Sequence, residues 1–581
     1  MSTSRLPLPS TGNRRHPLEI VRRKSTPLPE TGVRLAFWIT GIVFAVAQAG
    51  IFRFHVSADS ISYLDMSDAV IGGDWQRLIN GIWSPLYPLL LGIARSLFRI
   101  APAEEIAAAH IFNIALFVFA FACFEFFLRS IAAQTSADAE PDRRLLPLPL
   151  WAYLSLAYSL ILWASISAIS VRDLRPDMLM SGFLYAAVGL VLRMRAQPAT
   201  WRRFIILGIV LGVGFLAKEP MLPIGILLIA ISVAVVKDWR PSLKMAATAI
   251  AMMLLIGALY FVPLSRSRGH FTLGESGSFN YLAYVDGAGP NWYMQHPGRA
   301  RGTFTRPAEK IFTAPPAYAF PLTTLVTHPL RFDPSEWIAG VRPRFVLIAQ
   351  IRAVIRNGLD VGQSLVAVLV FIIALGGAWL LSGRRVLWDG LRATWPAALI
   401  GAAGICMYVL IHVEPRYVAA FLVLFFVSIM AGIGIPARFS NKLANPVILV
   451  CISLLLPIAS HTYIRHSQGI GRFDADAQAA ATLASLGIGR GDLVARISPV
   501  VNDLGIERIA RVEVIAEVDN AHANEFWAAP ESTQKELLSA FAARGAKAVI
   551  ATMPHLSQQN SSEWKQLGST RYWVWQPPGC C

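Results

Sequence analysis

Residues 35–52 read LAFWITGIVFAVAQAGIF, an apolar run without a charged side chain. Because a helix of roughly 20 residues crosses the hydrocarbon of a bilayer, this run predicts a first membrane span. No small-residue cleavage site is evident after it, which favours a retained span over a removed signal peptide. The basic segment 1–34 before it contains Pro, Ser and Thr and is expected to be a disordered cytoplasmic tail.

Similar apolar runs follow along much of the chain. Hydrophobic residues make up 55% and charged residues 15% of its 581 positions, whereas a soluble protein carries about 25% charged residues. This composition excludes an ordinary cytosolic enzyme. Further apolar runs lie at 106–128, 149–169, 177–192, 204–217, 220–236, 245–264, 363–382, 395–412, 417–436 and 445–463. With the first run, they predict an α-helical polytopic membrane protein of about eleven spans.

The segment 85–100 decides on which side of the membrane each loop lies. It is short and is broken by two prolines and two arginines, so we expect it to lie on the outer surface. The cytoplasmic loops then carry the basic clusters at 129–144, 193–203, 237–244, 384–392 and 438–442, in agreement with the positive-inside rule. The loops 55–105 and 265–360 are expected outside, together with the tail.

The basic excess gives a formal net charge of +16 and a pI near 9.9. In a polar chain this excess would suggest a nucleic-acid partner. In this apolar chain it indicates cytoplasmic loops and sites for anionic lipid groups, so we expect no nucleic acid. Three of the five cysteines lie inside apolar runs, and Cys580 and Cys581 end the chain. This pattern is neither a disulfide framework nor a zinc motif.

Residues 465–581 have a mixed, soluble composition. Helices are expected near 475–486 and 531–543, and strands near 493–498, 512–518, 546–553 and 571–576. These elements predict a small external α/β domain after the transmembrane domain 35–464. The glycine-rich segment 487–491 is expected to be a turn, because a dinucleotide fingerprint follows a strand and this segment follows a helix.

Ionisable residues gather at the ends of the predicted spans on the outer side. They are Asp59 in the first loop, Arg172, Asp173, Arg175 and Asp177 between spans three and four, Lys218 and Glu219 between spans five and six, and His412, Glu414 and Arg416 between spans nine and ten. Unpaired charge at a membrane boundary is unfavourable, so the cluster predicts a functional site. The alternative for each residue is a helix end whose charged side chain simply reaches water.

Segment 59–71, DSISYLDMSDAVI, predicts an amphipathic helix on the membrane surface, with Asp59 at its start. Partial loss of water makes a carboxylate more basic, so Asp59 is a candidate general base. The same position is equally compatible with the N-cap of that helix.

A larger pattern begins with Asp59, has Tyr63 four residues on, and continues with Gly73-Asp74 and an apolar segment led by Pro85. Later segments read RPD at 175–177, GFLAKEP at 214–220 and EPRY at 414–417. Together they resemble the membrane glycosyltransferases of the GT-C fold, in particular the protein O-mannosyltransferase-like and lipid A aminoarabinose transferase-like branch of glycosyltransferase family 39 type. The resemblance covers residues 35–440.

The resemblance implies transfer of one sugar from a polyprenyl-phosphate donor to an acceptor hydroxyl at the outer face of the membrane. Carried over by position, Asp59 is the base or acceptor-orienting carboxylate, Lys218 faces the lipid phosphate and Arg416 is a second phosphate ligand. Fixed cations stabilise the charge that develops on a leaving phosphate, and direct attack by one acceptor oxygen inverts the sugar. The sequence requires neither a metal ion nor a cofactor beside the lipid-linked sugar.

The chain also departs from this family at two positions. Relatives often have an acid directly after the first one and a basic residue before the proline, where this chain has Ser60 and Ser84. Arg172 or Arg175 is the expected substitute for the contacts made there. The supporting acidic and polar residues are expected to be Tyr63, Asp173, Asp177, Glu219 and Glu414.

The loop 265–360 is too long for a plain connector. Its aromatic residues include Tyr281, Tyr284 and Trp292, which are expected to stack on a sugar or a glycolipid acceptor. The alternative is a self-packed cap over the membrane cavity. Residues 335–356 look helical and basic and are expected to lie on the bilayer.

These observations predict a multi-pass protein of the bacterial inner membrane, with a cytoplasmic N-terminus and a periplasmic C-terminal domain. The expected partners are a polyprenyl-phosphate sugar, membrane lipids and a periplasmic glycan, lipid or protein acceptor. One alternative is a flippase or exporter of lipid-linked saccharide, in which charges would line a path through the bilayer. Another is a polymerase or ligase of oligosaccharides that uses a diphosphate-linked donor.

Overall fold

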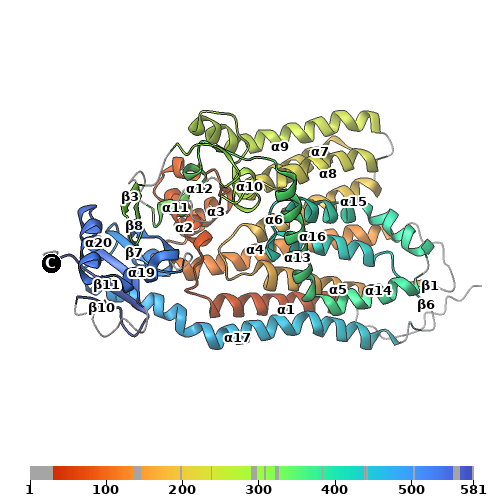
Figure 1. Ribbon diagram of the computed structural model, residues 1–581. Coiled ribbons are helices and arrows are strands. Elements are labelled where there is room, and N and C mark those ends of the chain that lie inside the picture. Colours follow the sequence, from red (N-terminus) through yellow and green to blue (C-terminus); the bar gives the residue numbers. More distant parts are fainter. Residues whose placement is uncertain are drawn as a thin grey trace, which may run out of the picture.

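The computed structural model describes residues 30–135, 145–196, 199–236, 239–288, 298–305, 309–320, 326–382, 384–436, 439, 442–500, 504–553 and 563–578. Trp292, Cys580, Cys581 and residues 1–29 of the predicted tail lie outside the described residues. Figure 1 shows a bundle of long helices that is covered at one end by shorter helices and a β-sheet. We call this end of the bundle, at which α6 begins with Asp177, the site end.

Each predicted apolar run is helical. The helices are α1 (Glu30–Ile51), α4 (Glu105–Thr135), α5 (Leu150–Leu162) with the π-helix η3 (Trp163–Ile169), α6 (Asp177–Ala196), α7 (Trp201–Ala217), α8 (Met221–Val235), α9 (Trp239–Arg268), α14 (Leu369–Leu381), α15 (Arg384–Val409), α16 (Pro415–Met430) and α17 (Ala444–Ser485). Among the described residues, five helices are long and apolar enough to cross a membrane, and a bent pair of helices could form a sixth span. The chain is therefore a multi-pass membrane protein, and the count of eleven spans stays a prediction.

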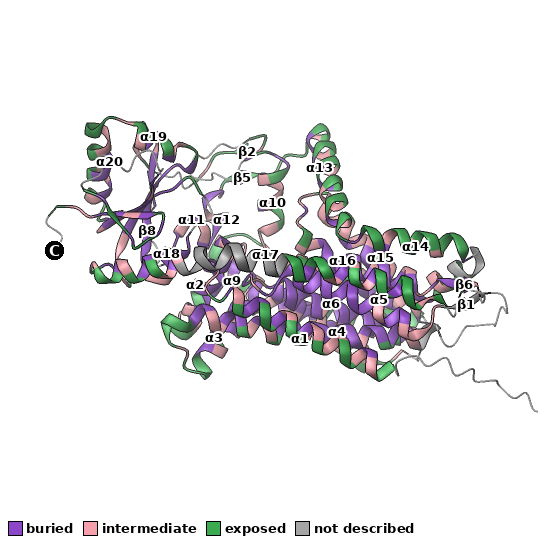
Figure 2. Cartoon of the chain, turned by 90° about the horizontal axis from the view of Figure 1, so that it is seen from below, coloured by how far each residue is buried: buried purple, intermediate pink, exposed green. Residues whose placement is uncertain are grey.

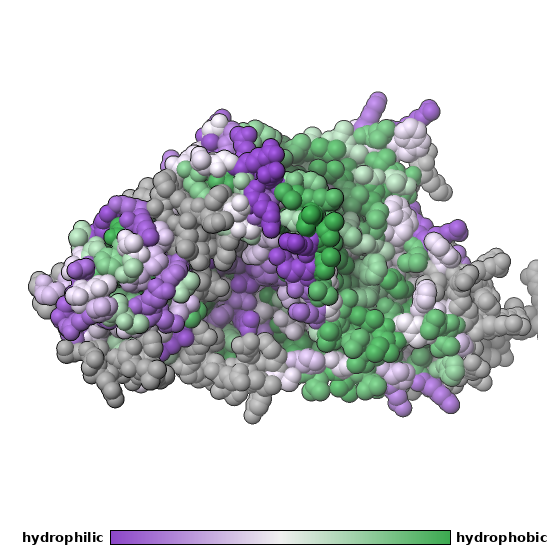
Figure 3. Space-filling model, in the orientation of Figure 1, coloured by the Kyte–Doolittle hydropathy of each residue, from purple (hydrophilic) through white to green (hydrophobic). Residues whose placement is uncertain are grey.

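The surface of the bundle supports this assignment. Figure 3 shows a broad band of hydrophobic side chains over the bundle helices, between hydrophilic regions at the two ends. Leu255 and Leu259 on α9 are 64% and 74% exposed, and Leu380 on α14 is 78% exposed. A water-soluble surface rarely presents an apolar area of this extent, whereas lipid tails cover it without penalty. Figure 2 shows that the interior of the bundle is continuously buried.

Two helix boundaries differ from the prediction. Helix α1 begins at Glu30, so the helix takes in the last residues of the predicted tail. Helix α17 is a single helix of 42 residues, which joins the predicted last span to the predicted first helix of the soluble domain. At 1.5 Å per residue it is roughly 60 Å long, about twice the hydrocarbon thickness. One continuous helix therefore leads the chain from the bundle to the sheet.

The loops 55–105 and 265–360 fold into further elements near the site end. The first loop forms α2 (Ala58–Ile71), η1 (Trp75–Leu78), α3 (Leu86–Leu97) and η2 (Pro102–Glu104). The long loop forms α10 (Ser276–Tyr284), β2 (Arg301–Gly302), β3 (Glu309–Phe312), β4 (Ala317–Ala319), α11 (Pro329–Phe332), α12 (Pro334–Trp337), β5 (Val341–Arg342) and α13 (Leu347–Val366). With 12 residues, α3 is roughly 18 Å long and too short to cross a bilayer. A small ladder of β1 (Leu145–Pro147) and β6 (Gly434–Pro436) lies at the opposite end.

Helix α2 forms where it was predicted, but protein rather than water covers its polar positions. Ten of its 14 residues are buried, on all sides of the helix. The long loop covers its polar positions, since Ser62 Oγ donates to the Arg331 carbonyl at 2.9 Å. Its N-cap is Ser57, whose hydroxyl accepts from the Ser60 amide, so Asp59 is not the N-cap and lies in the first turn.

The soluble domain is an α/β sandwich whose sheet also takes strands from the long loop. The sheet order is β10-β11-β9-β7-β8-β4-β3, with β7, β8 and β9 parallel and the outer strands antiparallel. The strands from the tail are β7 (Leu493–Ile497), β8 (Glu513–Val518), β9 (Ala548–Thr552), β10 (Lys565–Gln566) and β11 (Tyr572–Trp575). The predicted four strands and the helix α20 (Glu531–Ala543) are confirmed, and the glycines at 487–491 form a turn between α17 and β7. The pairing of β4 with β8 was not predicted, because it joins segments about 200 positions apart.

A buried ionic cluster fixes this domain on the first loop. Arg508 of α18 (Gly505–Ala510) is 2% exposed and donates to Asp65 at 2.6 Å, to Asp68 at 2.7 Å and to Glu105 at 2.7 and 2.9 Å. Arg95 of α3 also contacts Glu105, at 2.6 Å. We call Arg508 and its three carboxylate partners the Arg508 clamp. Since Asp65 and Asp68 lie on α2, the clamp holds the helix whose first turn carries Asp59.

The charge state of the clamp follows from its burial. Burial raises the pKa of Asp65 to about 6, although the Arg508 guanidinium and the Thr327 hydroxyl both favour its ionised form. Burial has the same effect on Asp68, but the charges of Arg508 and Arg511 outweigh it and lower the pKa of Asp68. A buried cation among three acids therefore stabilises the contact only while all partners are in place.

We expect Arg508→Met to destabilise the protein by about 3–5 kcal/mol, because it leaves the buried Asp65 without its cation. Asp68 and Glu105 lose one cation each and keep their ion pairs with Arg95 and Arg511. Thermal unfolding of the purified full-length chain measures the effect. Arg490→Met, which removes an exposed arginine of the same domain, is the matched control. Equal Tm values for the two variants would contradict the clamp.

Candidate functional site

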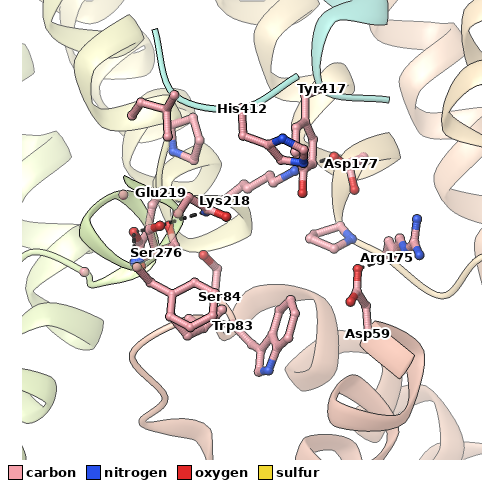
Figure 4. A pocket seen from close by; sticks show the side chains of 18 of the residues that line it. Asp59, Trp83, Ser84, Arg175, Asp177, Lys218, Glu219, Ser276, His412 and Tyr417 are labelled. Carbon is pink, nitrogen blue, oxygen red and sulfur yellow. Dashed lines mark hydrogen bonds and ion pairs between the residues drawn. The ribbon is translucent and has the colours of Figure 1, made fainter. Parts of the chain in front are cut away.

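A cavity of about 480 Å³ opens at the site end of the bundle. It lies between the ends of α6, α7, α8, α15 and α16, the first turn of α2, and α10. The polar and aromatic residues that line it are Asp59, Tyr63, Trp83, Ser84, Arg175, Asp177, Phe215, Lys218, Glu219, Ser276, Phe279, Asn280, Tyr284, Arg331, Tyr408, His412, Glu414, Arg416 and Tyr417. Figure 4 shows ten of them around the space. The helix ends converge here as the sequence predicted.

Asp59 is held by two guanidinium groups. Arg416 donates to Asp59 Oδ2 from both Nη1 and Nη2 at 3.1 Å, and Arg175 Nε lies 3.3 Å from the same oxygen. Arg416 is further fixed by Glu414, whose Oε2 accepts from its Nε at 2.6 Å. Charge-assisted contacts of this kind orient both partners. One carboxylate and two cations thus share one wall of the cavity.

Lys218 forms a second charged centre opposite this group. Its ammonium is paired with Asp177 at the start of α6 and lies 4.1 Å from the centre of the Tyr417 ring. Asp177 Oδ2 is also 3.9 Å from Arg416 Nη1, so the two centres are connected. Lys218 ends α7 with extended backbone, which is why the Lys-Glu-Pro turn can direct both ionisable side chains into the cavity.

Asp173 and Arg172 do not line the cavity, contrary to their predicted place in the site. His55 Nε2 lies 3.2 Å from Asp173 Oδ1, and Arg172 Nε lies 3.4 Å from Oδ2. Burial would raise the pKa of Asp173, but the hydrogen bond to His55 and the charge of Arg175 hold it well below its usual range. Asp173 thus supports Arg175, whose Nη1 is 3.9 Å away, from behind the cavity wall.

The segment that carries these residues turns sharply. The π-helix η3 ends at Ile169, and Ser170 follows with φ of 72°, a left-handed conformation that is rare for a residue other than glycine. Gln48 of α1 holds this turn, because its Oε1 accepts from the Val171 amide at 2.7 Å. Such π-helical turns are frequent at functional sites.

Glu219 and α10 form the cavity wall on the side of the long loop, to which α10 belongs. Glu219 Oε2 accepts from the Ser276 amide at 3.1 Å and from its hydroxyl, and Oε1 accepts from the Tyr260 hydroxyl at 3.2 Å. Burial raises the pKa of Glu219 to about 7, although these hydrogen bonds favour the ionised form. Gly274 is required beside it, since a Cβ there would lie 2.2 Å from the carboxylate.

Aromatic rings complete the cavity. Tyr284 of α10 stacks on His412 with ring centres 3.6 Å apart and an angle of 4° between the planes. Tyr63 packs edge-on against Trp83, 5.3 Å away. Stacked rings beside hydroxyl and carboxylate groups suit a ligand that has both apolar and polar faces. The loop is therefore part of the cavity wall, as well as its cover.

Most of the predicted site residues meet at this cavity. Asp59, Tyr63, Arg175, Asp177, Lys218, Glu219, Tyr284, Glu414 and Arg416 all line it. Tyr281 does not, because its hydroxyl donates to Gln350 of α13 at 3.0 Å. Sequence reasoning assigned no role to Tyr408, Tyr417, Ser276, Asn280 or Arg331. The sequence could have indicated Tyr417, since it follows Arg416 directly at the start of a predicted span. Nothing in the sequence around Arg331 indicated a place in the site.

The chemistry available here is electrostatic. Besides His412, four carboxyl side chains and four lysine or arginine side chains line the cavity: Asp59, Asp177, Glu219 and Glu414 with Arg175, Lys218, Arg331 and Arg416. Three of the bases surround Asp59 and Asp177, so an anionic group that enters can exchange places with a carboxylate at these cations. The described residues contain no group of three or more His, Cys, Asp and Glu arranged to hold a metal ion.

No protein-family model matches the chain, and no curated protein matches it. Among solved structures, ArnT from Cupriavidus metallidurans in the apo state is similar with 14% identity and a TM-score of 0.42, over 94% of this chain and 98% of that chain. The same protein bound to undecaprenyl phosphate is similar with 12% identity, a TM-score of 0.42 and the same coverage.

A further similar structure is the archaeal oligosaccharyltransferase AglB from Archaeoglobus fulgidus, in complex with an inhibitory peptide and a dolichol-phosphate. Its identity is 12% and its TM-score 0.44, over 90% of this chain and 70% of that chain. Identities and TM-scores as low as these assign no activity to the chain.

The raised pKa of Glu219 predicts a dependence of stability on pH. The folded state binds the proton of the Glu219 carboxyl group more tightly than the unfolded state does. The contribution of Glu219 to the free energy of unfolding therefore falls as the pH rises from about 4.5 to about 7, and it is then constant. Glu219→Gln removes this dependence. We therefore expect the Tm advantage of the wild type over the variant to be larger at about pH 5 than at about pH 8. An advantage that grows with pH would contradict the shift.

Proposed function

We propose that this chain is an inverting glycosyltransferase that moves one sugar from a polyprenyl-phosphate donor to an acceptor hydroxyl on a glycolipid, polysaccharide or protein. The observation that carries the proposal is Asp59, held by Arg416 and Arg175 and facing the Lys218 ammonium across a cavity at the membrane boundary. A base, phosphate-binding cations and a space for a sugar are thus in one place.

The position of the cavity suits a lipid-linked donor. Each buried CH₂ of an isoprenoid tail contributes about 0.8 kcal/mol, so the tail stays in the bilayer and the reaction must occur at its boundary. The far ends of the site helices carry exposed or half-exposed basic residues, such as Arg193 on α6, Arg202 on α7 and Lys244 on α9. By the positive-inside rule, these basic ends support the proposal that the cavity lies at the outer face of a bacterial inner membrane.

The role of each charged residue follows from its contacts. The donor phosphate binds Arg416, Arg175 and Lys218, and it thereby competes with Asp59 and Asp177 for these cations. Once its guanidinium partners turn to the phosphate, Asp59 is a stronger base and can accept the proton of the acceptor hydroxyl. Glu414 keeps Arg416 in place throughout, because it binds the Nε atom and leaves both Nη atoms to the ligand.

The proposed step replaces one bond of the anomeric carbon by another and moves one proton. The acceptor oxygen attacks the anomeric carbon, the bond from that carbon to the phosphate oxygen breaks, and polyprenyl phosphate leaves with the electron pair. The acceptor proton passes to Asp59. The cations stabilise the charge that grows on the leaving phosphate, and attack from the opposite side of the ring inverts the configuration. The step itself uses no cofactor beside the lipid-linked sugar.

The alternatives predict a different distribution of charge or a different product. A flippase or exporter needs polar groups along a path through the bundle, whereas the residues that line this cavity come from helix ends on one side. An oligosaccharide polymerase or ligase would release a polyprenyl diphosphate. The product of the reaction therefore separates the three functions.

The test is release of free polyprenyl phosphate by the purified protein in nanodiscs, with a panel of polyprenyl-phosphate sugars and a membrane glycolipid extract. We expect release with one sugar, and a loss of at least about a hundredfold in rate for Asp59→Asn, since the base is removed.

Asp74→Asn is the matched control, because Asp74 lies in the same loop, is 44% exposed and pairs only with Arg77 among the contacts of the described residues. It should keep the wild-type rate. Release that is unaffected by Asp59→Asn would overturn the assignment of the base. Release of a diphosphate, or movement of intact donor across the membrane without release, would replace the proposal by one of its alternatives.

A further inference from the structure

Four arginines gather where two short strands of the long loop pair. Strands β2 and β5 pair antiparallel, with Arg301 directly opposite Arg342. Arg299 and Arg344 flank this pair, and all four side chains are exposed. We call these four residues the arginine hairpin, although β3, β4, α11 and α12 lie between the two strands in the sequence. Like charges directly opposite on a ladder destabilise it, so this arrangement favours an anionic partner.

Within the described part of the chain, no carboxylate pairs with the arginine hairpin. The Arg299 side chain donates to the Val285 carbonyl at 3.3 Å, and the backbone amide of Arg344 donates to the Asp286 carboxylate at 2.8 Å. Asp286 is fully buried and holds the backbone of the hairpin, so it does not neutralise the side chains. The positive charge of the hairpin therefore faces outward.

Helix α13 follows the hairpin after a short turn and has the features of an interfacial helix. Its buried face, which includes Ala349, Ala353 and Asn357, packs on α10 and the site end of α15. The opposite face is apolar and exposed, and consists of Leu347, Ile348, Ile351, Ile355 and Leu359. Arg352 and Arg356 are exposed at its border. This combination of an apolar face and bordering arginines is typical of helices that lie at the level of lipid headgroups.

The direction of α13 agrees with this assignment. Figures 1 and 2 both show it running at a steep angle to the bundle helices, and it meets α14 at an angle of 88°. Gln350 and Asn357 donate to the carbonyls of Leu410 and Val409 at the end of α15, at 2.6 and 2.9 Å. These contacts fix α13 at the membrane boundary on the site end.

We propose that α13 and the arginine hairpin form a binding surface for anionic phospholipids of the surrounding leaflet. The apolar face of α13 takes the upper part of the acyl chains, and the arginines contact the phosphate groups. A soluble anion would use only the second of these contacts, so the pairing of both features favours a lipid. The proposal does not depend on the glycosyltransferase function.

The surface is also connected to the cavity. Arg356 Nη2 donates to the Tyr284 carbonyl at 2.9 Å, and Gln350 accepts from the Tyr281 hydroxyl at 3.0 Å. Tyr284 in turn stacks on His412 in the cavity wall. Lipids bound along α13 therefore lie next to the wall formed by α10.

The experiment uses the full-length protein in phosphatidylcholine nanodiscs that contain spin-labelled phosphatidylglycerol or, separately, spin-labelled phosphatidylcholine. The motionally restricted fraction of each label gives their relative affinity for the protein. We expect the wild type to prefer phosphatidylglycerol, and Arg301→Gln with Arg342→Gln to lower that preference about fivefold or more, since each arginine near a membrane surface contributes to anionic-lipid binding.

The control carries Arg490→Gln with Lys565→Gln, two exposed basic residues of the soluble domain, and should keep the wild-type preference. Melting temperatures equal to that of the wild type ensure that each variant is folded. An unchanged preference in the hairpin variant, or an equal fall in the control, would overturn the proposal. Displacement of the lipid label by soluble glycerol phosphate would show a free-phosphate site and would also overturn it.

Discussion

Asp59 keeps its carboxylate at the edge of a membrane because two guanidinium groups, from Arg175 and Arg416, bind the same oxygen. These arginines come from the starts of two different bundle helices, so their meeting point is determined by the packing of the whole bundle. At the far end of α2, Arg508 binds two acids of the same helix. The membrane bundle and the soluble domain thus hold one short helix from opposite ends, and the geometry of the cavity depends on both.

This arrangement explains which parts of the site could be predicted from the sequence. Apolar runs are long and periodic, and their ends must lie at a membrane boundary. Charged residues at those ends, such as Lys218 and Arg416, therefore share a plane even when hundreds of positions separate them. Asp59 was predictable for the same reason. The sheet strands of the tail were equally clear, because each is a short apolar run between turns.

Other contacts could not be predicted from the sequence. Arg508 and Glu105 are single charged residues, 403 positions apart, in segments of ordinary composition. The pairing of β4 with β8 likewise depends on the path of the long loop in the folded protein, which the sequence of the loop does not indicate. Helix α2 looked amphipathic, yet its polar positions are buried, because the soluble domain and the loop supply partners for them. Polar residues indicate contact with water only when no other segment covers them.

The central claim is that a donor phosphate and Asp59 compete for Arg416 and Arg175. Binding of polyprenyl phosphate without a sugar, measured by titration calorimetry on wild type and Asp59→Asn, tests it most directly. The account predicts that the variant binds the lipid about tenfold more tightly or better, because removing the carboxylate charge frees both guanidinium groups. Equal or weaker binding by the variant would contradict it, since Asp59 would then hold the arginines in place for the phosphate.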